Sequence, residues 1–318
     1  MERAEEIPIF FSTNDNYAKH VCVAIASILD NSKSSFHFCI LTSGLCEESK
    51  NAIVQTAEGN TVEFISIDRR DFESFNVMLA HLSVEACYRY LIADLKPEFD
   101  KAIYLDCDLI VLDDIKKLYD TDIKDFYAAC GDEILKVSHY KKLGLSRYFN
   151  SGVLLLNCAL MRRDNLTEQL FKKTAELSGK SKYLDQDVLN IVFSKKLKFF
   201  HMRWNATNPI FRKSANVKFL KKVAAQARDN PAIVHFSGPD KPWKIPYGVL
   251  SHPYSAAYFY YLAKTPYADW ARDFVGNFRP LKTALWYWKR HLLFFLRPTF
   301  WKMASIRKSV AKRYGRNF

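Results

Sequence analysis

The feature that most constrains the fold is an alternation of short apolar runs and helical patterns over the first 67 residues. Residues 7–12, 37–41 and 62–67 are predicted to be strands because they are short and mostly apolar. Residues 17–29 and 47–57 lie between them and are predicted to be helices. A β-α-β-α-β order is typical of a parallel sheet with helices on its faces.

The rest of the chain extends this α/β pattern. Residues 153–156 form an unbroken Val-Leu-Leu-Leu run, which is expected of a strand covered on both faces. Acidic residues stop after Asp273, so the main domain is predicted to end between 250 and 275. The expected fold is one Rossmann-like α/β domain with a mixed, mostly parallel sheet. Further predicted elements are strands at 102–105, 126–130, 152–156 and 232–236, and helices at 84–95, 160–177 and 186–193.

Charge divides the chain into a nearly neutral body and a basic tail. The net charge is +13, and residues 279–318 hold five Lys, six Arg and no acid. A domain that binds nucleic acid across its surface would spread this charge over the body, so no nucleic-acid partner is expected. The predicted division is a main domain at 1–275 and a helical tail at 276–318.

The tail is predicted to attach to an anionic membrane surface, because cations and aromatic rings suit the headgroup region of a bilayer. Two alternatives are docking on the main domain and binding to nucleic acid. Pro298 ends the first apolar run, and a second basic segment follows it. The apolar positions recur every three or four residues, at Leu281, Leu285, Trp288, Leu292 and Phe295.

The seven cysteines are expected to be buried free thiols, because their number is odd and no Cys-x-x-Cys pair occurs. The acidic N-terminus lacks a stretch of signal-peptide length, and no apolar run is long enough to span a membrane. A reducing, cytoplasmic location is therefore expected. The triplets that begin at Asn165 and Asn205 then have no meaning as glycosylation sites.

Two acids, Asp106 and Asp108, interrupt an apolar stretch at the end of the strand predicted at 102–105. Ligand crevices in open α/β sheets lie at the carboxyl ends of strands. A divalent metal would offset the cost of burying two carboxylates there and would also neutralise a diphosphate. The alternative is a polar strand end whose acids cap a neighbouring helix.

His235 ends the late strand, and Gly238-Pro239 follows it before Lys241 and Trp243. The histidine is a candidate third metal ligand, and the lysine is a candidate cation for a phosphate oxygen. The alternative is a structural histidine at a strand end. Glycine is scarce, with 10 in the chain, and no Gly-rich phosphate loop is present.

Two further polar groups, Asn150-Ser151-Gly152 and Asp185-Gln186-Asp187, open a predicted strand and a predicted helix. Amides and carboxylates at such openings suit hydrogen bonds to sugar hydroxyls. The alternative for Asp185 and Asp187 is N-terminal helix capping.

Together these residues resemble glycosyltransferase family 8, and within it the bacterial lipooligosaccharide galactosyltransferases. The similarity covers roughly residues 7–250 in order, and the fold it implies is of the GT-A type. The residues that carry it are Asn16-Tyr17, Arg89, Tyr104-Leu105-Asp106, Asp108, Asn150, Gly152-Val153-Leu154, Asp185-Gln186-Asp187, His235, Gly238-Pro239 and Lys241-Pro242-Trp243.

The resemblance implies a role for each matching residue. Asp106, Asp108 and His235 would hold Mn²⁺, with Mg²⁺ as the alternative. The uridine pocket would be formed by Ser12, Asn14 and Asn16, and the phosphates would lie on Gly238 and Lys241. The donor hexose would be positioned by Arg89, Asp132, Asn150, Ser151, Asp185 and Gln186, and the acceptor would lie near His81, Tyr183 and Ser237.

The sequence departs from the family pattern at Asn14, where the family has Asp. An Asn carbonyl still accepts a hydrogen bond from a uracil N–H, so uridine binding is expected to persist.

The function implied is transfer of galactose or glucose from a UDP-sugar to a lipopolysaccharide core, with retained anomeric configuration. Front-side attack is favoured, because Gln186 is a poor nucleophile, and Asp185 is the alternative nucleophile. Such an enzyme would lie on the cytoplasmic face of a bacterial inner membrane. The rival functions are a sugar nucleotidyltransferase and a non-catalytic membrane-binding module.

Overall fold

The computed structural model describes residues 6–70, 72, 84–181, 183–212, 218–238, 241–244, 252–276 and 298–315. His81 and the first apolar run of the tail, at 281–295, lie outside these residues, so the expectations placed on them are not addressed by the structure.

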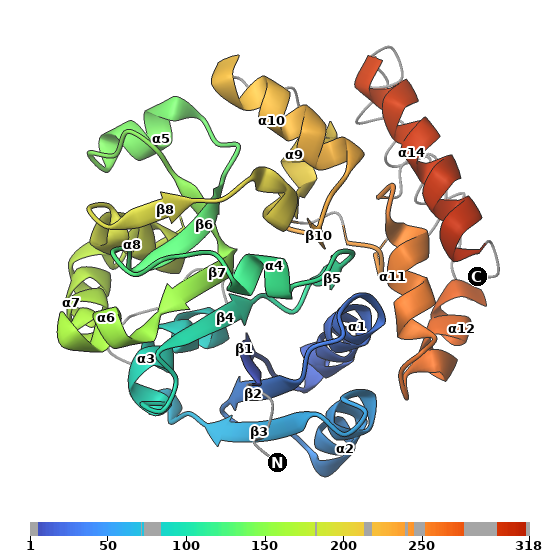
Figure 1. Cartoon of the computed structure of the whole chain (residues 1–318), viewed down its shortest axis with the longest axis horizontal. Coiled ribbons are helices and arrows are strands. Elements are labelled where there is room, and N and C mark those ends of the chain that lie inside the picture. The colour runs from blue at the N-terminus through green and yellow to red at the C-terminus, as the bar shows by residue number, and fades with distance from the viewer. Residues whose placement is uncertain are drawn as a thin grey trace.

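The core of the described fold is a seven-stranded sheet in the order β3-β2-β1-β4-β7-β6-β8 (Figure 1). Strand β7 pairs antiparallel with both β4 and β6, and the other neighbouring strands pair in parallel. The expected mixed, mostly parallel sheet is therefore confirmed. The strands are β1 (Ile7–Ser12), β2 (Phe36–Thr42), β3 (Thr61–Ser66), β4 (Lys101–Leu105), β6 (Ala128–Asp132), β7 (Phe149–Asn157) and β8 (Leu197–Phe199).

Helices cover both faces of this sheet, and β1 shows why its sequence is apolar throughout. Ile9 packs into the same apolar cluster as α1 (Asp15–Asn31) and α2 (Glu47–Thr56). Phe10 points to the opposite cluster. That cluster is closed by η2 (Val84–Leu91), α3 (Ile92–Leu95), α6 (Cys158–Arg163), α7 (Leu166–Leu177) and α8 (Leu184–Phe193).

A second, three-stranded sheet joins distant parts of the chain. Its order is β5-β10-β9, with β5 at Leu109–Val111, β10 at Ile233–His235 and β9 at Ala206–Thr207. Strand β10 pairs antiparallel with β5 and parallel with β9. This pairing sets His235 opposite Leu109, one residue beyond Asp108.

Three sequence predictions need correction. The helix predicted at 84–95 is mostly the 3₁₀ helix η2, followed by the short α3. The helix predicted at 160–177 is two helices, because Asn165 adopts a left-handed conformation (φ 53°) between α6 and α7. The strand predicted at 126–130 begins two residues later, as β6.

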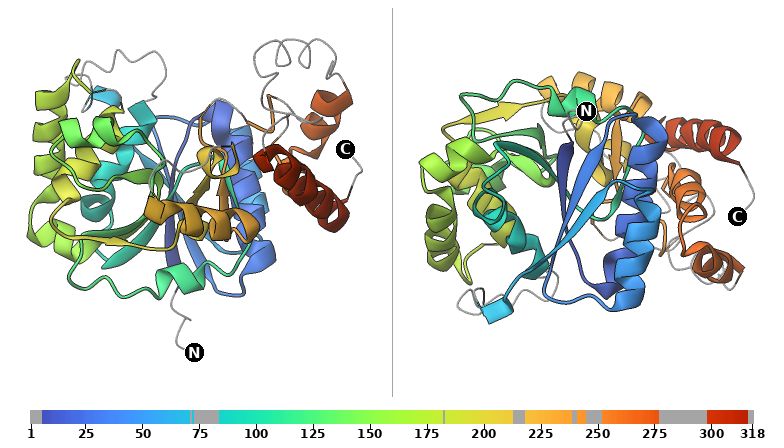
Figure 2. Two further views of the ribbon diagram at one scale, coloured as in Figure 1. Left: turned by 90° about the horizontal axis from the view of Figure 1, so that it is seen from above. Right: turned by 60° about the horizontal axis from the view of Figure 1, so that its bottom comes forward.

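The remaining described helices lie between the later strands and after β10 in the chain. They are α4 (Lys116–Tyr119), α5 (Val137–Lys142), η3 (Met202–Asn205), α9 (Asn208–Arg212), α10 (Lys218–Asp229), α11 (Ser255–Leu262), α12 (Ala268–Gly276) and α14 (Pro298–Tyr314). Helices α11, α12 and α14 form a layer outside α1 (Figures 1 and 2).

The described part of the tail docks on the body of the protein. Met303 and Val310 of α14 are buried in the same apolar cluster as Tyr258 and Tyr261 of α11. Lys302 also pairs with Asp229 at the end of α10, with 2.6 Å between nitrogen and oxygen. The docking alternative therefore holds for α14, while membrane attachment stays a prediction. Among the described helices, none combines the length and apolar character that a membrane span requires.

Candidate active site

The candidate site lies where β1 and β4 end and β7 begins. Because β7 runs antiparallel to β4, its first residues lie beside the last residues of β4. The Asp106 N–H accordingly donates to the Gly152 carbonyl at 2.8 Å. A pocket of about 310 Å³ opens at this edge. Of the residues predicted from the sequence, those that line it are Ser12, Asn14, Arg89, Asp106, Asp108, Ser151, Tyr183, Asp185 and Gln186.

The three predicted metal ligands lie together at this pocket. Ligand atoms of Asp106, Asp108 and His235 are all within 4.8 Å of one another. His235 Nε2 is 3.1 Å from Asp108 Oδ1 and 3.7 Å from Asp106 Oδ2. A Cβ atom on Gly152 would collide with Asp106 and His235, so the close approach of β7 requires glycine. Two carboxylates and an imidazole are a donor set that fits a divalent ion such as Mn²⁺.

Charges inside the cluster are balanced by Lys241, whose ammonium contacts Asp108 Oδ2. Burial alone would raise the pKa of Asp108, but Lys241 and His235 together lower it below its ordinary value. Burial alone would lower the pKa of His235, and the neighbouring Asp108 raises it instead. The lowered pKa favours the ionised form of Asp108.

Arg89 bridges two acids of the site from the buried face of η2. Its Nη2 is 3.1 Å from Asp106 Oδ1 and 3.6 Å from Asp185 Oδ2, and its side chain is 3% exposed. Nη1 donates to the Ser151 carbonyl, and the guanidinium lies 4.3 Å from the centre of the Tyr104 ring. The structure thus gives Arg89 a set of internal partners that fix the acids in place.

Asp185 and Gln186 reach the pocket from the start of α8. Gln186 Oε1 accepts from the Ser151 N–H at 3.0 Å, and Gln186 Nε2 donates to Tyr148 Oη at 3.3 Å. Burial raises the pKa of the Asp185 carboxyl, although Arg89 counteracts this effect. Asp187 points away from the pocket and accepts from Ser181 Oγ at 2.6 Å and from Tyr148 Oη at 2.5 Å.

Two predicted sugar-binding residues do not line the pocket. The Asn150 side chain donates to Glu133 Oε2 at 2.7 Å and accepts from Asn205 Nδ2 at 2.9 Å. Asp132 forms a two-pronged ion pair with Arg147, at 2.5 and 2.7 Å. Contact of either side chain with a sugar stays a prediction, and the observed partners give both a structural role.

The predicted uridine end of the pocket contains unpaired polar atoms. Within the described part of the chain, Ser12 Oγ and Asn14 Oδ1 are buried without a hydrogen-bond partner. Such atoms indicate a missing partner, because burying an unpaired polar group is costly. Asn14 Nδ2 donates to Glu85 Oε1 at 3.3 Å, which leaves the carbonyl oxygen of Asn14 as an acceptor. Asn16 is exposed and does not line the pocket.

An aromatic stack holds the loop that carries Lys241. The Trp243 ring lies 3.8 Å from the His20 ring and nearly parallel to it, and it also packs on Tyr258. His20 Nδ1 is 2.6 Å from Tyr258 Oη, and burial lowers the pKa of His20 to about 3. Gly238 has a φ of 77°, which favours glycine at the turn before this loop.

The predicted acceptor residues are only partly brought to the site. Tyr183 lines the pocket, whereas the Ser237 carbonyl accepts from Asn208 Nδ2 at 2.5 Å. The sequence interpretation missed Glu85 and Asn205. The only signal for Glu85 was an acid in an apolar helical segment, and Asn205 appeared only in a glycosylation-like triplet.

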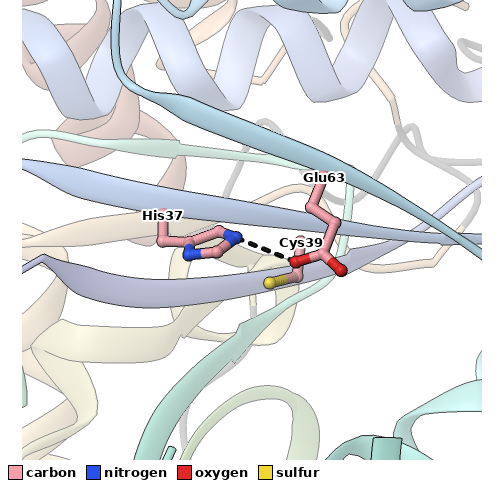
Figure 3. Close-up of side chains that lie close together, drawn as sticks. All are labelled: His37, Cys39 and Glu63. Carbon is pink, nitrogen blue, oxygen red and sulfur yellow. Dashed lines mark hydrogen bonds and ion pairs between the residues drawn. The ribbon is translucent and has the colours of Figure 1, made fainter. Parts of the chain in front are cut away.

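A second set of ligand-type side chains lies away from the pocket, between β2 and β3 (Figure 3). His37 Nε2 is 3.0 Å from Glu63 Oε2, and the Cys39 thiol lies beside them. Lys96 Nζ is 2.8 Å from the same Glu63 oxygen. Lys96 Nζ is also 2.5 Å from Glu98 Oε1, so a metal ion at this group would have to displace an ammonium held by two carboxylates.

The sheet is mixed, and an acid pair and a pocket lie at its carboxyl edge. This architecture, shared with similar solved structures, is that of a glycosyltransferase of the GT-A fold. The chain belongs to glycosyltransferase family 8, whose model, described as "Glycosyl transferase family 8", matches residues 8–245. The resemblance inferred from the sequence motifs is thereby confirmed, and so is the fold class.

Three similar proteins illustrate this relationship. General stress protein A of Bacillus subtilis is 31% identical over 290 residues, which cover 87% of this chain and 98% of that protein. A lipopolysaccharide 1,2-glucosyltransferase of Escherichia coli is 26% identical, covering 76% and 75% of the two chains. The galactosyltransferase LgtC, crystallised with donor and acceptor sugar analogues, is 25% identical with a TM-score of 0.69, covering 82% of this chain and 96% of LgtC.

Proposed function

We propose that this enzyme transfers galactose or glucose from a UDP-sugar to a sugar of a lipopolysaccharide core, with Mn²⁺ and with retention of configuration. The observation that carries the proposal is the grouping of Asp106, Asp108 and His235 beside a pocket lined by Asp185 and Gln186. The choice between galactose and glucose stays open, because the similar proteins include a glucosyltransferase and a galactosyltransferase.

The donor would lie across the pocket from β1 to α8. Ser12 Oγ and Asn14 Oδ1, both unpaired within the described residues, would bind the uracil and ribose. The hexose would lie near Asp185 and Gln186, where Arg89 fixes the Asp185 carboxylate. Bound Mn²⁺ would stabilise the negative charge that develops on the departing diphosphate.

Lys241 would exchange one anion for another during the reaction. In the structure its ammonium contacts Asp108 Oδ2. A bound diphosphate would present additional anionic oxygens, and Lys241 would then donate to the leaving phosphate. No general acid is required at this leaving group, which distinguishes the site from that of a glycosidase.

Front-side attack fits the surroundings of Asp185 better than a covalent intermediate on it. The Asp185 side chain is 7% exposed and faces Arg89 Nη2 at 3.6 Å. A carboxylate paired with a guanidinium is a weakened nucleophile. The departing phosphate would therefore accept the proton of the acceptor hydroxyl, while the acceptor oxygen bonds to the anomeric carbon on the same face.

The test is hydrolysis of UDP-galactose, UDP-glucose and UDP-N-acetylglucosamine by the purified protein, with Mn²⁺ and with chelator. The expected result is slow, metal-dependent release of UDP from UDP-galactose or UDP-glucose. Asp108→Ala should abolish this release. No turnover of any donor and no binding of UDP would refute the proposal. Synthesis of a UDP-sugar from UTP and a sugar phosphate would instead support the nucleotidyltransferase alternative.

Membrane attachment through the tail is a separate part of the proposal, on the cytoplasmic face of a bacterial inner membrane. Its basis is the charge of residues 279–318, together with the exposed lysines of α14 at 302, 308 and 312. Lys308→Glu with Lys312→Glu should reduce co-sedimentation with anionic vesicles and leave UDP-sugar hydrolysis unchanged. Equal vesicle binding by the double variant and the wild type would contradict a role for α14.

A further inference from the structure

A chain of buried side-chain hydrogen bonds leads from Glu133 to the back of His235. Asn150 Nδ2 lies 2.7 Å from Glu133 Oε2, and Asn150 Oδ1 lies 2.9 Å from Asn205 Nδ2. Asn205 Oδ1 lies 2.9 Å from His235 Nδ1. Four side chains from β7, β10, η3 and the segment after β6 are thus connected in series.

Glu133 fixes which groups donate and which accept along this series of hydrogen bonds. A carboxylate only accepts, so the amide group of Asn150 must face Glu133. The carbonyl oxygen of Asn150 then faces the Gly152 N–H, which donates to it at 3.0 Å. Because that oxygen also faces Asn205, Asn205 must present its NH₂ group there. The carbonyl oxygen of Asn205 is consequently left to face His235.

An acceptor at Asn205 Oδ1 requires a proton on His235 Nδ1. In the neutral imidazole the lone pair then lies on Nε2, the nitrogen that faces Asp108 Oδ1 at 3.1 Å. A histidine that ligates a metal needs this tautomer, and the group that receives the other N–H sets it.

We propose that Asn205 is a positioning residue that holds His235 in the metal-binding tautomer and orientation. The inference rests on the proposed role of His235 as a metal ligand. It adds a residue that does not line the pocket, that holds Asn150 on one side and that faces His235 on the other.

The backbone around Asn205 makes this contact rigid. Asn205 is 1% exposed and directly precedes β9, which pairs in parallel with the strand of His235. A Cβ atom on Gly131 would lie 3.2 Å from Asn205 Cβ and 3.0 Å from the Phe200 ring, so glycine at 131 allows β6 to pass close to Asn205. A residue so buried also cannot be a glycosylation site, although it opens an Asn-Ala-Thr triplet.

The test measures binding of Mn²⁺ by titration calorimetry, on the full chain with saturating UDP, and subtracts a titration of Mn²⁺ into UDP without protein. Asn205→Ala removes the acceptor and should weaken Mn²⁺ binding about 10- to 100-fold, the usual effect of losing a partner behind a ligating histidine. Asn205→Asp keeps an oxygen toward His235 Nδ1 but loses the N–H that Asn150 Oδ1 accepts, so it should bind Mn²⁺ more weakly than wild type and more tightly than Asn205→Ala.

The control is Asn157→Ala, which removes a carboxamide at the far end of β7, where it caps α6. This variant should melt at a lower temperature and bind Mn²⁺ like the wild type. Wild-type affinity in Asn205→Ala, or equal loss of affinity in Asn205→Ala and Asn205→Asp, would overturn the inference and leave the proposed function standing. Failure of the wild type to bind Mn²⁺ with UDP would overturn both.

Discussion

Among the described residues, two groups of side chains contain the residue types that bind metals, and the two differ in whether their surroundings suit a metal site. The pocket cluster is Asp106, Asp108 and His235, and the sheet cluster is His37, Cys39 and Glu63. In the pocket cluster, Asp106 and Asp108 lie on the turn between β4 and β5, and His235 lies at the end of β10, beside a pocket. The sheet cluster lies within paired strands, where Cys39 is opposite Glu63.

The two clusters differ in what surrounds each ligand. His235 is held from behind by Asn205, whereas the Nδ1 atom of His37 faces Glu6 at 3.8 Å. Cys39 is fully buried, and burial raises the pKa of its thiol, so forming a thiolate there is costly. Ligand identity and proximity therefore do not define a metal site without access and a supporting shell.

The two lysines sharpen this contrast. Lys96 contacts both Glu63, at 2.8 Å, and Glu98, at 2.5 Å. Lys241 contacts Asp108 and lies 5.7 Å from the Trp243 ring, on a loop next to the pocket. The Lys96 ammonium is held between two carboxylates, whereas the Lys241 ammonium contacts one carboxylate of the pocket cluster.

The largest effect is expected from Asp108→Asn, which keeps the shape of the side chain and removes a charged metal ligand. Turnover of the UDP-sugar should fall about 10³-fold or more, because the charge on the diphosphate would lose its counterion. Steady-state UDP release with and without Mn²⁺ measures this effect. Glu63→Gln is the matched control. Its turnover should stay within about twofold of wild type, because Glu63 does not line the pocket and a partly exposed ion pair contributes little to stability.

Gly152→Ala should have the next largest effect. The added methyl group would meet Asp106 and His235, so the pocket cluster would have to spread apart. We expect about a 100-fold loss of turnover, with about 1–3 kcal/mol lost from the free energy of unfolding through overpacking. Chemical denaturation and UDP release measure the two quantities. The control is Ala26→Gly in the middle of α1, which should cause a comparable loss of stability away from the pocket. Gly59→Ala is less suitable, because the positive φ of Gly59 would add backbone strain.

Full activity in Gly152→Ala would mean that the pocket cluster tolerates a shift of β7. Equal loss of activity in Ala26→Gly would assign the effect to stability alone.

Lys241→Ala should reduce turnover by about 30-fold, the contribution of one charge-assisted hydrogen bond to a leaving group. Lys96→Ala is its counterpart in the sheet cluster. That variant should lower the melting temperature and leave turnover unchanged, because it strips a partner from Glu63 and Glu98. An unchanged kcat in Lys241→Ala would show that Lys241 serves only to neutralise Asp108.

The part of the fold that could be predicted from the sequence is the part with strong periodicity. Strands β1 to β3 and helices α1 and α2 lie within two residues of their predicted positions. In the small sheet, the predicted strand at 232–236 is confirmed as β10, whereas β5 and β9 could not be predicted, because they have three and two residues and no measurable period. The pairing of β10 with β5, more than a hundred residues earlier in the sequence, is a contact that local patterns do not encode.

The site was predictable to a similar extent and for a related reason. Asp106 follows the apolar strand β4, and ligand sites lie at the carboxyl edge of such a sheet. His235 ends β10 of the small sheet, and the pairing of β10 with β5 sets it beside Asp108. The partners of Asn150 were not predictable, because Asn205 lies 55 residues away in the sequence and Glu133 lies 17 residues away. The antiparallel direction of β7 also had no local signal, although it brings Ser151 and Gly152 to the site.

The smallest effect is expected from Cys39→Ser, which tests the sheet cluster directly. The hydroxyl replaces a thiol within the apolar cluster that includes Phe10 and Leu41, so the variant should lose about 1–2 kcal/mol of unfolding free energy. UDP-sugar turnover should stay within about twofold of wild type, because substitutions that leave a site's geometry intact affect mainly stability.

Metal binding at the sheet cluster requires that Lys96 leave Glu63 and that the Cys39 thiol lose its proton in a buried position. A chelator should therefore leave the melting temperatures of both the metal-free wild type and Cys39→Ser unchanged. Added Zn²⁺ should bind equally to the wild type and to Cys39→Ser. Stoichiometric Zn²⁺ binding that is lost in Cys39→Ser would break the comparison. It would show that the cost of displacing Lys96 is smaller than the gain from a Cys-His-Glu ligand set.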